Sequence, residues 1–269
     1  MKRKGIILAG GDGKRLMPLT KSFSKHFLPI YDKPMIFYPL SFLMLLGLRE
    51  IIIVTKSRDL DSYVSLLGDG SYLGIRINYV IQDKSEGLVN ALVLCESLCF
   101  NSKITLILGD NFFYGNSLIK SVKDLQTNQK QACVFAYPVK NPEEYCVIEF
   151  SKDRIPKNLI EKPDKFISKY VITGLYLYDE NVFDIAKFVK KSARGEYEIT
   201  DLNKYFLKGS NLEISFLGRG ITWLDMGTFD MINEAGNFVK TIEKRQSLKI
   251  SCPEEIAWRL GWINNNELE

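Results

Sequence analysis

The chain has 269 residues, of which 46% are hydrophobic and 25% charged, and its net charge is +4. This composition is typical of a globular protein with a substantial core, and the length suits one large domain or one domain with an appendage. The 36 basic residues are scattered along the sequence, which argues against a dedicated nucleic-acid binder because such proteins usually carry a basic stripe.

The cysteines and the apolar runs indicate the compartment. The five cysteines form neither a C-x-x-C pair nor zinc-finger spacing, so we expect free thiols. The longest apolar run, MIFYPLSFLMLLGL, is broken by Pro39 and Ser41 and is short for a membrane span. The apolar run GIILAGG starts at residue 5, which leaves no room for a charged leader before it. We therefore expect a soluble, cytoplasmic protein that does not bind membranes.

The front half alternates between predicted strands and predicted helices. Buried-strand patterns occupy 5–10, 50–56, 76–82 and 103–110, and helical patterns occupy 36–48 and 86–98. Apolar strands without alternation, separated by helices, indicate a parallel sheet that is covered on both faces. Ligands of such sheets bind at the carboxyl ends of the strands. The residues directly after the apolar runs are therefore the first candidates for a site.

From about residue 130 the predicted strands are rich in β-branched and aromatic residues. They occupy 132–139, 145–150, 158–162, 170–179 and 212–218, and helices are predicted near 180–190 and 199–208. Apolar residues at helical spacing predict an amphipathic helix over 227–246, with its core-facing side formed by Met231, Ile232, Ala235, Phe238, Val239 and Ile242. The tail 253–263 predicts one more short helix.

The stretch GIILAGGDGKRLMPLTKSFSKHFLPI, residues 5–30, places three glycines directly after the first strand. A Rossmann fingerprint would need a third glycine where Leu16 stands, and a Walker A loop would need glycine at Leu8 and Ser or Thr at Arg15. Glycines after a strand still let backbone N–H groups approach an anion. The guanidinium of Arg15 adds a planar fork of N–H donors that suits phosphate oxygens, and the ammonium of Lys25 adds a single positive charge. We interpret the stretch as a phosphate site; a tight turn with two solvated cations is the alternative.

A set of motifs extends this pattern over nearly the whole chain. Besides LAGGDGKRLMPLT and SKHFLP they are LILGDNFFYG, IEKP, ITGLYLYD, SARGEYEIT, LGRGITWLDMGT and IEKRQSLKISCPEEIAWRLGW. In register from about residue 4 to 262, they resemble the motifs of sugar-nucleotide pyrophosphorylases and, within them, of bacterial glucose-1-phosphate thymidylyltransferases. The resemblance implies formation of dTDP-glucose and pyrophosphate from dTTP and α-D-glucose 1-phosphate, with Mg²⁺ as cofactor.

The resemblance and the element pattern together give the expected architecture. We expect an α/β fold with a Rossmann-like mixed, mostly parallel sheet flanked by helices, a β-rich sugar-binding part and a C-terminal helical segment. One nucleotidyltransferase domain would cover 1–240, with its nucleotide-binding part at about 1–130 and its sugar-phosphate-binding part at about 131–226. Residues 241–269 would form a helical extension with an interface or regulatory role.

The implied reaction is attack of a sugar phosphate oxygen on the α-phosphorus of the triphosphate. The nucleophile is already an anion, so the enzyme needs positioning and charge stabilisation rather than a general base. Arg15 would steady the leaving pyrophosphate, and Lys25 would act on the transition-state charge. Asp110 and Asp225 would hold Mg²⁺ together with phosphate oxygens and water. A lone aspartate at a strand end is more often a helix N-cap, so this assignment depends on the matched motifs.

The resemblance also implies the binding residues. Nucleotide contacts are expected from Leu8, Gly10, Gly11, Gly13, Gln82, Gly87 and Asp110. Sugar-phosphate contacts are expected from Tyr145, Cys146, Glu161, Lys162, Thr173 and Arg194. A regulatory site is expected at Arg219, Glu255 and Arg259, since enzymes of this type form homotetramers with feedback by a dTDP-sugar end product. The product would supply dTDP-rhamnose and cell-surface polysaccharide synthesis.

Several residues depart from the family pattern. Cys146 stands where the family has glycine beside the sugar, so we expect a sugar preference shifted away from plain glucose. The loop 82–91 lacks both family prolines, and Val89 and Asn90 stand where the family has Ala and Gln. Lys14 replaces threonine, which adds a positive charge beside the phosphates.

Two alternatives stay open. The same chemistry could use UTP or another sugar 1-phosphate, and a sugar-nucleotide sensor without catalysis is the alternative from another functional class. The presence of Lys25 and of both metal-ligand candidates argues against the sensor. His26 is the only histidine, and we assign it no role as a proton shuttle because the reaction requires neither an acid nor a base.

Overall fold

The computed structural model describes residues 2–127 and 130–269. The chain divides into two compact units. The first, called the glycine-loop unit below, consists of Arg3–Ser85, Ile107–Gly115 and Thr222–Glu269. The second, called the β-rich unit, consists mainly of Glu86–Leu106 and Asn116–Ile221. Each unit is described separately.

A parallel sheet forms the centre of the glycine-loop unit. Strand β1 (Lys2–Leu8) pairs in parallel with β4 (Glu50–Thr55), and β4 pairs in parallel with β5 (Arg76–Ile81). The core positions of β1 and β4 are almost completely buried, because strands covered on both faces have no solvent side. The prediction of buried parallel strands is therefore confirmed for β1 and β4, whereas β5 pairs in parallel but is only partly buried. The last two residues of β6 (Ser102–Leu108) also belong to this unit.

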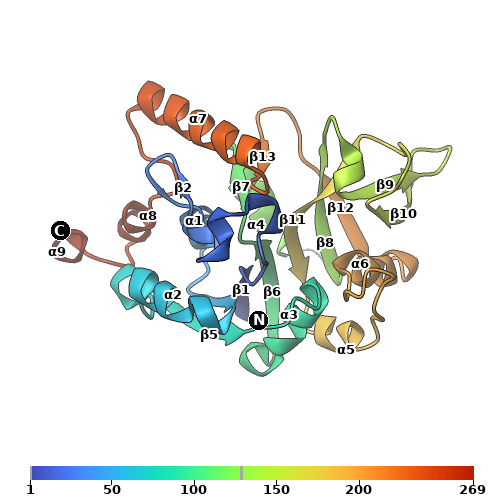
Figure 1. Cartoon of the computed structure of the whole chain (residues 1–269), viewed down its shortest axis with the longest axis horizontal. Helices are drawn as coiled ribbons and strands as arrows, with labels where there is room; N and C mark the ends of the chain where they lie inside the picture. Colours follow the sequence, from blue (N-terminus) through green and yellow to red (C-terminus); the bar gives the residue numbers. More distant parts are fainter. Residues whose placement is uncertain (1, 128–129) are drawn as a thin grey trace. The chain divides into compact units, whose positions relative to one another are not determined.

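The glycine-loop unit also contains the α-helices α1 (Phe37–Leu45), α2 (Leu60–Leu67), α7 (Phe229–Gln246), α8 (Pro253–Arg259) and α9 (Asn265–Leu268), which Figure 1 labels. Helix α1 is buried along most of its length, which explains why its sequence is apolar all round. Helix α7 starts after Thr228, whose hydroxyl caps it by accepting the N–H of Met231 at 3.3 Å. The predicted helix at 227–246 is confirmed.

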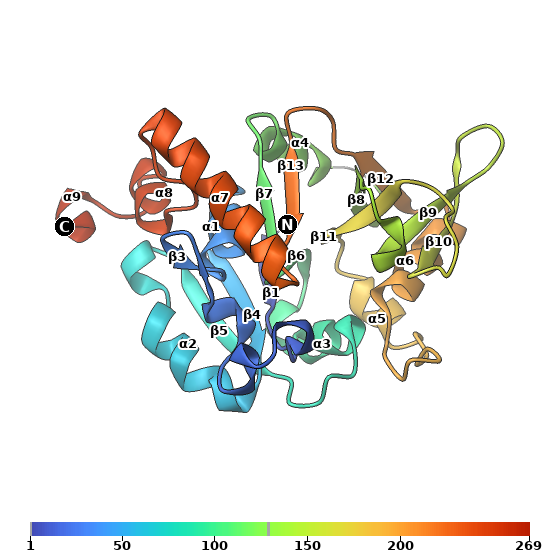
Figure 2. The same ribbon diagram turned by 45° about the horizontal axis from the view of Figure 1, so that its top comes forward.

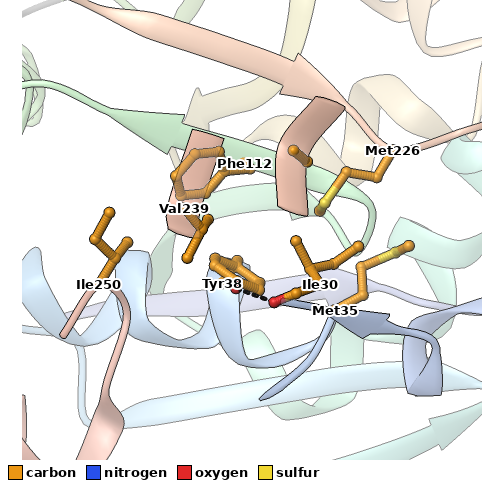
Figure 3. Packing of buried hydrophobic residues seen from close by; sticks show 8 residues of the cluster. Ile30, Met35, Tyr38, Phe112, Met226, Val239 and Ile250 are labelled. Atoms are coloured by element: carbon orange, nitrogen blue, oxygen red, sulfur yellow. Dashed lines mark hydrogen bonds between the residues drawn. The ribbon is translucent and has the colours of Figure 1, made fainter. Parts of the chain in front are cut away.

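An apolar cluster holds α7 in place (Figure 3). It consists of Ile30, Met35, Tyr38, Phe112, Met226, Ala235, Val239 and Ile250. The Tyr38 hydroxyl donates to the Ile30 carbonyl at 2.6 Å, so the one polar atom of this ring is paired inside the cluster. Met226 in this cluster directly follows Asp225. Packing of α7 therefore fixes the end of the strand that carries a predicted metal ligand.

Two short ribbons complete the glycine-loop unit. Strand β7 (Asn111–Tyr114) pairs antiparallel with β13 (Thr222–Asp225), and β2 (Pro29–Ile30) pairs with β3 (Lys33–Pro34). The β7–β13 register places Asp225 opposite Asn111. This ribbon was not predicted from the sequence, and it joins segments more than one hundred residues apart.

The β-rich unit has mainly antiparallel strands (Figure 2). Strand β9 (Cys146–Phe150) pairs antiparallel with β10 (Pro156–Glu161), and β8 (Ala132–Pro138) pairs antiparallel with β11 (Tyr170–Tyr178) and parallel with β12 (Leu212–Phe216). Its helices are α3 (Leu88–Leu94), α4 (Leu118–Leu125), α5 (Val182–Ala186) and α6 (Ile199–Lys208). The expected fold class, a mixed α/β fold with a β-rich second part and a helical C-terminal segment, is confirmed.

The cysteines agree with the sequence prediction. All five are free; Cys95, Cys99 and Cys133 are buried, and Cys146 and Cys252 are half-buried. Among the residues that the structure describes, no helix is both long and apolar enough to cross a bilayer.

Candidate active site

The glycine-rich loop follows β1 at the carboxyl end of the parallel sheet. The Leu8 carbonyl accepts the N–H of Gly109, and the N–H of Ala9 donates to Val54 at 2.8 Å. Gly13 has a φ of 60°, and a Cβ there would lie 2.9 Å from Thr20 Cγ2, so only glycine fits both the conformation and the space.

The N–H groups of this loop are the strongest sign of an anion site. In the described part of the chain, those of Gly10, Gly11 and Gly13 donate to no other group. A Cβ at Gly11 would meet no atom within 4 Å, so the loop is open on that side. Successive unpaired N–H groups make a concavity suited to anions. Of the predicted nucleotide residues, Gly10, Gly11 and Gly13 therefore lie in one loop, and Leu8 ends the strand before it.

Arg15 lies against the turn that follows β13. Its Nη2 is 3.9 Å from Oδ2 of Asp225, and a Cβ at Gly227 would lie 2.3 Å from the same nitrogen. The guanidinium thus occupies space that any side chain at position 227 would fill. The structure brings together Arg15 and Asp225, both predicted, with Gly227, which the sequence reasoning missed.

Lys25 pairs with Asp110 at the carboxyl end of β6. The Lys25 ammonium donates to Oδ2 of Asp110, and both side chains are largely buried. Burial alone would raise the pKa of Asp110, but the Lys25 ammonium and the amide of Asn111 outweigh it and lower this pKa to about 2. Asp110 is therefore ionised at neutral pH and balances a cation before any substrate binds.

The two predicted metal ligands lie at one end of the β7–β13 ribbon, with Asp110 directly before β7 and Asp225 at the end of β13. The N–H of Met226 donates to the Asp110 carbonyl at 2.9 Å, and Asp225 is in register with Asn111 on the neighbouring strand. The indole of Trp223 donates to Oδ1 of Asn111 at 2.6 Å, which holds this residue in place. Two carboxylates at adjacent strand ends are the oxygen donors that Mg²⁺ prefers.

Described residues include no group of three or more His, Cys, Asp or Glu side chains that could hold a metal ion. A metal held by Asp110 and Asp225 therefore requires further oxygen ligands from phosphate and water, which is the usual coordination of Mg²⁺ in nucleotide sites. The residues present fit Mg²⁺ in that form.

Gln82 and His26 are buried in the same unit. The N–H of Gln82, directly after β5, donates to Thr55 at 2.8 Å, and its Oε1 lies 3.4 Å from the position of a Cβ at Gly10. Burial and the Lys25 charge lower the pKa of His26 to about 3, and its Nδ1 pairs with Ser24 at 2.9 Å. A neutral, buried imidazole is unsuited to shuttle protons at neutral pH, which agrees with the sequence interpretation.

In the β-rich unit Arg194 lies among three carboxylates. It contacts Glu161 at 3.6 Å, Glu196 at 3.3 Å and Glu198 at 3.3 Å. Burial and the neighbouring carboxylates Glu161 and Glu196 raise the pKa of Glu198, although Ser192 and Arg194 act to lower it. The structure thus brings the predicted residues Glu161 and Arg194 together and adds Glu198, which the sequence reasoning missed.

Cys146 starts β9 and lies opposite Glu161 in the β9–β10 register. Burial raises the pKa of its thiol to about 12, although a hydrogen bond with Thr200 lowers it. The Thr200 hydroxyl also donates to Oε2 of Glu161 at 2.5 Å. The thiol is therefore protonated at neutral pH and adjoins a carboxylate that was predicted to bind the sugar.

Thr173, Lys162 and Tyr145 are further predicted sugar residues. Thr173 on β11 is buried, and its hydroxyl has no hydrogen-bond partner among the described residues, which is uncommon for a buried polar group unless a ligand or water completes it. Lys162 has a φ of 41°, and its N–H donates to the Tyr145 carbonyl at 3.0 Å. In the described ranges no carboxylate lies within 4.0 Å of its ammonium.

Gly87 belongs to the β-rich unit, unlike Gln82. It has a φ of 102°, and a Cβ there would lie 2.6 Å from the Tyr197 carbonyl. The neighbouring backbone pairs with the same residue, since the N–H of Tyr197 donates to Glu86 at 2.8 Å and that of Val89 to Tyr197 at 3.2 Å. Gly87 is required here both by conformation and by close backbone packing.

The three predicted regulatory residues fall in different units. Arg219 lies in an exposed loop of the β-rich unit, whereas Glu255 and Arg259 form an ion pair of 2.7 Å on α8 in the glycine-loop unit. This is an ordinary surface pair four residues apart on a helix.

Comparison with known proteins agrees with the geometry. The profile of the family described as Nucleotidyl transferase matches residues 4–242. A protein of Neisseria meningitidis named glucose-1-phosphate thymidylyltransferase is 48% identical over 266 residues, which are 99% of this chain and 92% of that protein. A protein of Mycobacterium tuberculosis with the same name is 48% identical and covers 98% of this chain and 92% of its own length.

Solved structures are similar too. A structure described as a glucose-1-phosphate thymidylyltransferase of Bacillus anthracis in complex with sucrose superposes with a TM-score of 0.81 at 38% identity, covering 88% of this chain and 94% of that one. A UDP-glucose pyrophosphorylase complexed with UDP-glucose gives a TM-score of 0.78 at 25% identity, with 90% and 100% covered. The family profile and the full-length relatives leave one assignment: the chain belongs to the nucleotidyl transferase family.

Proposed function

We propose that this nucleotidyltransferase forms dTDP-glucose and pyrophosphate from dTTP and α-D-glucose 1-phosphate. The observation that carries the proposal is the glycine-rich loop, in which the N–H groups of Gly10, Gly11 and Gly13 are unpaired. The pair of Lys25 and Asp110 lies in the same unit. The names of relatives that are 48% identical over nearly the whole chain support the choice of base and sugar.

In this proposal the glycine-loop unit binds the triphosphate. The loop N–H groups hold phosphate oxygens, and the half-exposed guanidinium of Arg15 binds the β- and γ-phosphates and so steadies the leaving pyrophosphate. Lys25 places its positive charge near the α-phosphate, where negative charge develops. Leu8 and Gln82 bind the nucleoside, with the amide of Gln82 giving a donor and an acceptor to the pyrimidine edge.

We assign the metal role to Asp110 and Asp225. Mg²⁺ bound there would neutralise phosphate oxygens and favour an in-line geometry. The two carboxylates hold position without it, because Lys25 and Arg15 pair with them. When a nucleotide binds, each of these cations is then free to exchange its carboxylate for a phosphate oxygen.

The sugar phosphate is assigned to the β-rich unit. Lys162 and Arg194 bind the phosphate, while Tyr145, Glu161 and Thr173 bind sugar hydroxyls. The unpaired, buried hydroxyl of Thr173 supports this role. Gly87 shapes the loop that precedes α3.

Cys146 is proposed to influence which sugar is preferred. Its side chain adjoins Glu161 and Thr200, so it takes up space beside a proposed hydroxyl ligand. Replacing Cys146 by glycine should change the order of preference among sugar 1-phosphates by a few-fold in kcat/KM. An unchanged order across glucose, amino-sugar and deoxy-sugar substrates would contradict this role.

The proposal also covers the oligomeric state, the cellular location and the regulation of the enzyme. We propose a cytoplasmic homotetramer that uses Mg²⁺, binds neither nucleic acid nor membrane, and supplies the dTDP-rhamnose route to surface polysaccharides. Feedback by a dTDP-sugar would involve Arg219, Glu255 and Arg259. One nucleotidyltransferase domain over 1–240 with a helical extension over 241–269 is the proposed organisation.

The test is a pyrophosphate-release assay with Mg²⁺ that crosses dTTP and UTP with glucose 1-phosphate and with amino- and deoxy-sugar 1-phosphates. We expect the fastest turnover with dTTP and a hexose 1-phosphate. Faster turnover with UTP would instead favour uridylyl transfer, which the similarity to a UDP-glucose pyrophosphorylase structure keeps as the second candidate. Nucleotide binding without turnover on any pair would indicate a sensor.

A further inference from the structure

The glycine-rich loop contains an acidic residue at an unexpected position. Asp12 lies between Gly11 and Gly13, inside the loop whose unpaired N–H groups suit an anion. A carboxylate beside a triphosphate repels it, and this repulsion grows where water is partly excluded. The loop therefore requires something that neutralises Asp12 or holds it away.

Lys56 provides that partner. We propose that Lys56 is a positioning residue of the triphosphate site: its ammonium neutralises Asp12 and holds that carboxylate back from the bound phosphates. The inference rests on the proposed function, because it concerns the phosphate site of the same reaction. Lys56 itself contacts no substrate in this account and acts through Asp12.

The sheet explains why these two residues meet. Strand β1 pairs in parallel with β4, with Leu8 in register with Val54. Asp12 therefore follows the end of β1 and Lys56 follows the end of β4 on the neighbouring strand. Parallel strands end at the same edge of a sheet, so the residue after β4 is within reach of the loop after β1. The Lys56 ammonium hydrogen bonds to Oδ1 of Asp12.

Both oxygens of the carboxylate are engaged. Ser85 donates to Oδ2 of Asp12 at 3.2 Å, so Lys56 and Ser85 hold the two sides of the group. The hydrogen bond from Lys56 lowers the pKa of Asp12, which means that the carboxylate stays charged and needs compensation. The exposed fraction is 13% for the Lys56 side chain and 33% for that of Asp12, so solvent screens this pair only in part.

The same contacts tie the glycine loop to the segment after β5. Ser85 belongs to that segment, and Asp83 in it accepts both the N–H and the hydroxyl of Ser57, at 2.9 and 2.7 Å. Polar contacts of Asp12 and Ser57 thus connect the segments that follow β1, β4 and β5. Lys56 provides the hydrogen-bonded cation of this network, and the charge of Lys14 acts on Asp12 more weakly than Lys56 does.

The test is direct binding of dTTP, measured by calorimetry at low ionic strength without sugar phosphate. Lys56→Met should weaken dTTP binding by about tenfold, because an uncompensated carboxylate then faces the phosphates. Lys56→Met combined with Asp12→Asn should restore the affinity to within about threefold of the original chain. Thymidine, which has no phosphate, should bind all variants equally.

Two controls separate charge from folding. Lys56→Arg keeps the charge and should keep the affinity. Lys4→Met removes a cation of similar exposure, 19%, from the opposite end of the same strand pair, where Lys4 contacts Glu50 at 3.0 Å. It should leave dTTP binding unchanged. Thermal unfolding of each variant shows whether a loss of affinity reflects a loss of fold.

Each remaining outcome overturns the inference. Unchanged affinity in Lys56→Met would mean that Asp12 needs no neutralisation. A double variant as weak as Lys56→Met would mean that Lys56 contacts phosphate itself or only supports the fold. A parent chain that binds thymidine and dTTP equally weakly would overturn the proposed function as well, so the two failures are distinguishable.

Discussion

The two units differ in the ratio of cationic to acidic side chains at their predicted site residues. In the glycine-loop unit the predicted cations pair with the predicted carboxylates: Lys25 with Asp110 and Arg15 with Asp225. In the β-rich unit one cation, Arg194, faces three carboxylates and is 41% exposed. The first arrangement is balanced, and the second has a surplus of negative charge.

The difference corresponds to what each unit is proposed to bind. A triphosphate carries several charges, so cations that exchange carboxylates for phosphate oxygens can receive it while a metal takes over the carboxylates. A sugar phosphate carries fewer charges and many hydroxyls, and surplus carboxylates are good acceptors for hydroxyl groups. We therefore expect charge substitutions to act strongly in the glycine-loop unit and more weakly in the β-rich unit.

The largest expected effect is that of Lys25→Met. Loss of this ammonium removes charge stabilisation at the α-phosphate, and we expect kcat to fall by roughly 10² to 10³. With Mg²⁺ present to neutralise Asp110, the affinity for dTTP should change by only a few-fold, since the loop N–H groups remain. Steady-state kinetics and calorimetric binding separate the two quantities. A loss of affinity equal to the loss in kcat would assign Lys25 to ground-state binding instead.

The Lys25–Asp110 pair also predicts how stability depends on pH. The pKa of Asp110 in the folded chain is lowered to about 2 from a usual value near 4. The stability that the ionised Asp110 contributes is therefore complete above about pH 5 and is lost as the pH falls through this lowered pKa. Chemical unfolding without metal or nucleotide measures it. Asp110→Asn should show a shallower decline over this range, and identical slopes would contradict the assignment.

In the β-rich unit Arg194→Ala should raise the KM for glucose 1-phosphate by about tenfold. The effect is smaller than that of Lys25 because the guanidinium is exposed and already shared among three carboxylates. Lys187→Ala is the matched control, since Lys187 is similarly exposed and pairs with Glu96 at 2.6 Å in the same unit. Binding of dTTP should not change in either variant. A rise in the KM for dTTP would place Arg194 with the nucleotide.

Much of the fold could be predicted because its strands are unusually apolar. The strands at 50–55 and 76–81 and the helix at 229–246 appear within a few residues of the predicted ranges. Helices α2 and α4 were missed because polar residues interrupt the apolar pattern of both. The β7–β13 ribbon was missed because its pairing depends on tertiary contacts between segments far apart in sequence.

The candidate site likewise contains residues that the sequence predicts and residues that only the fold brings together. Gly13 and Lys25 could be predicted because a turn after a strand and a cation near phosphate leave local signals. The pairing of Lys56 with Asp12 depends on which strands are neighbours. Lys56 follows a predicted strand, so the rule that ligands bind at strand ends could have indicated it. Gly227 lies in the motif LGRGITWLDMGT, which could have indicated it, but its contact with Arg15 depends on the fold.

The smallest expected effect concerns Gly227. Its backbone φ is not in the region that favours glycine, and a Cβ there would meet the Arg15 guanidinium and Oδ1 of Asp225. The residue is therefore required for space. Because the end of an arginine side chain moves easily, Gly227→Ala should displace Arg15 without unfolding the chain.

We expect Gly227→Ala to raise the KM for dTTP by about three- to fivefold with little change in thermal stability. Gly236→Ala is the control, since a Cβ on that glycine of α7 would be 3.5 Å from the nearest atom; it should stabilise the helix slightly. The decisive comparison is made with Arg15→Ala already present. If alanine at 227 acts by displacing Arg15, it should then have no further effect, whereas a second loss of the same size would show that Gly227 acts independently of Arg15.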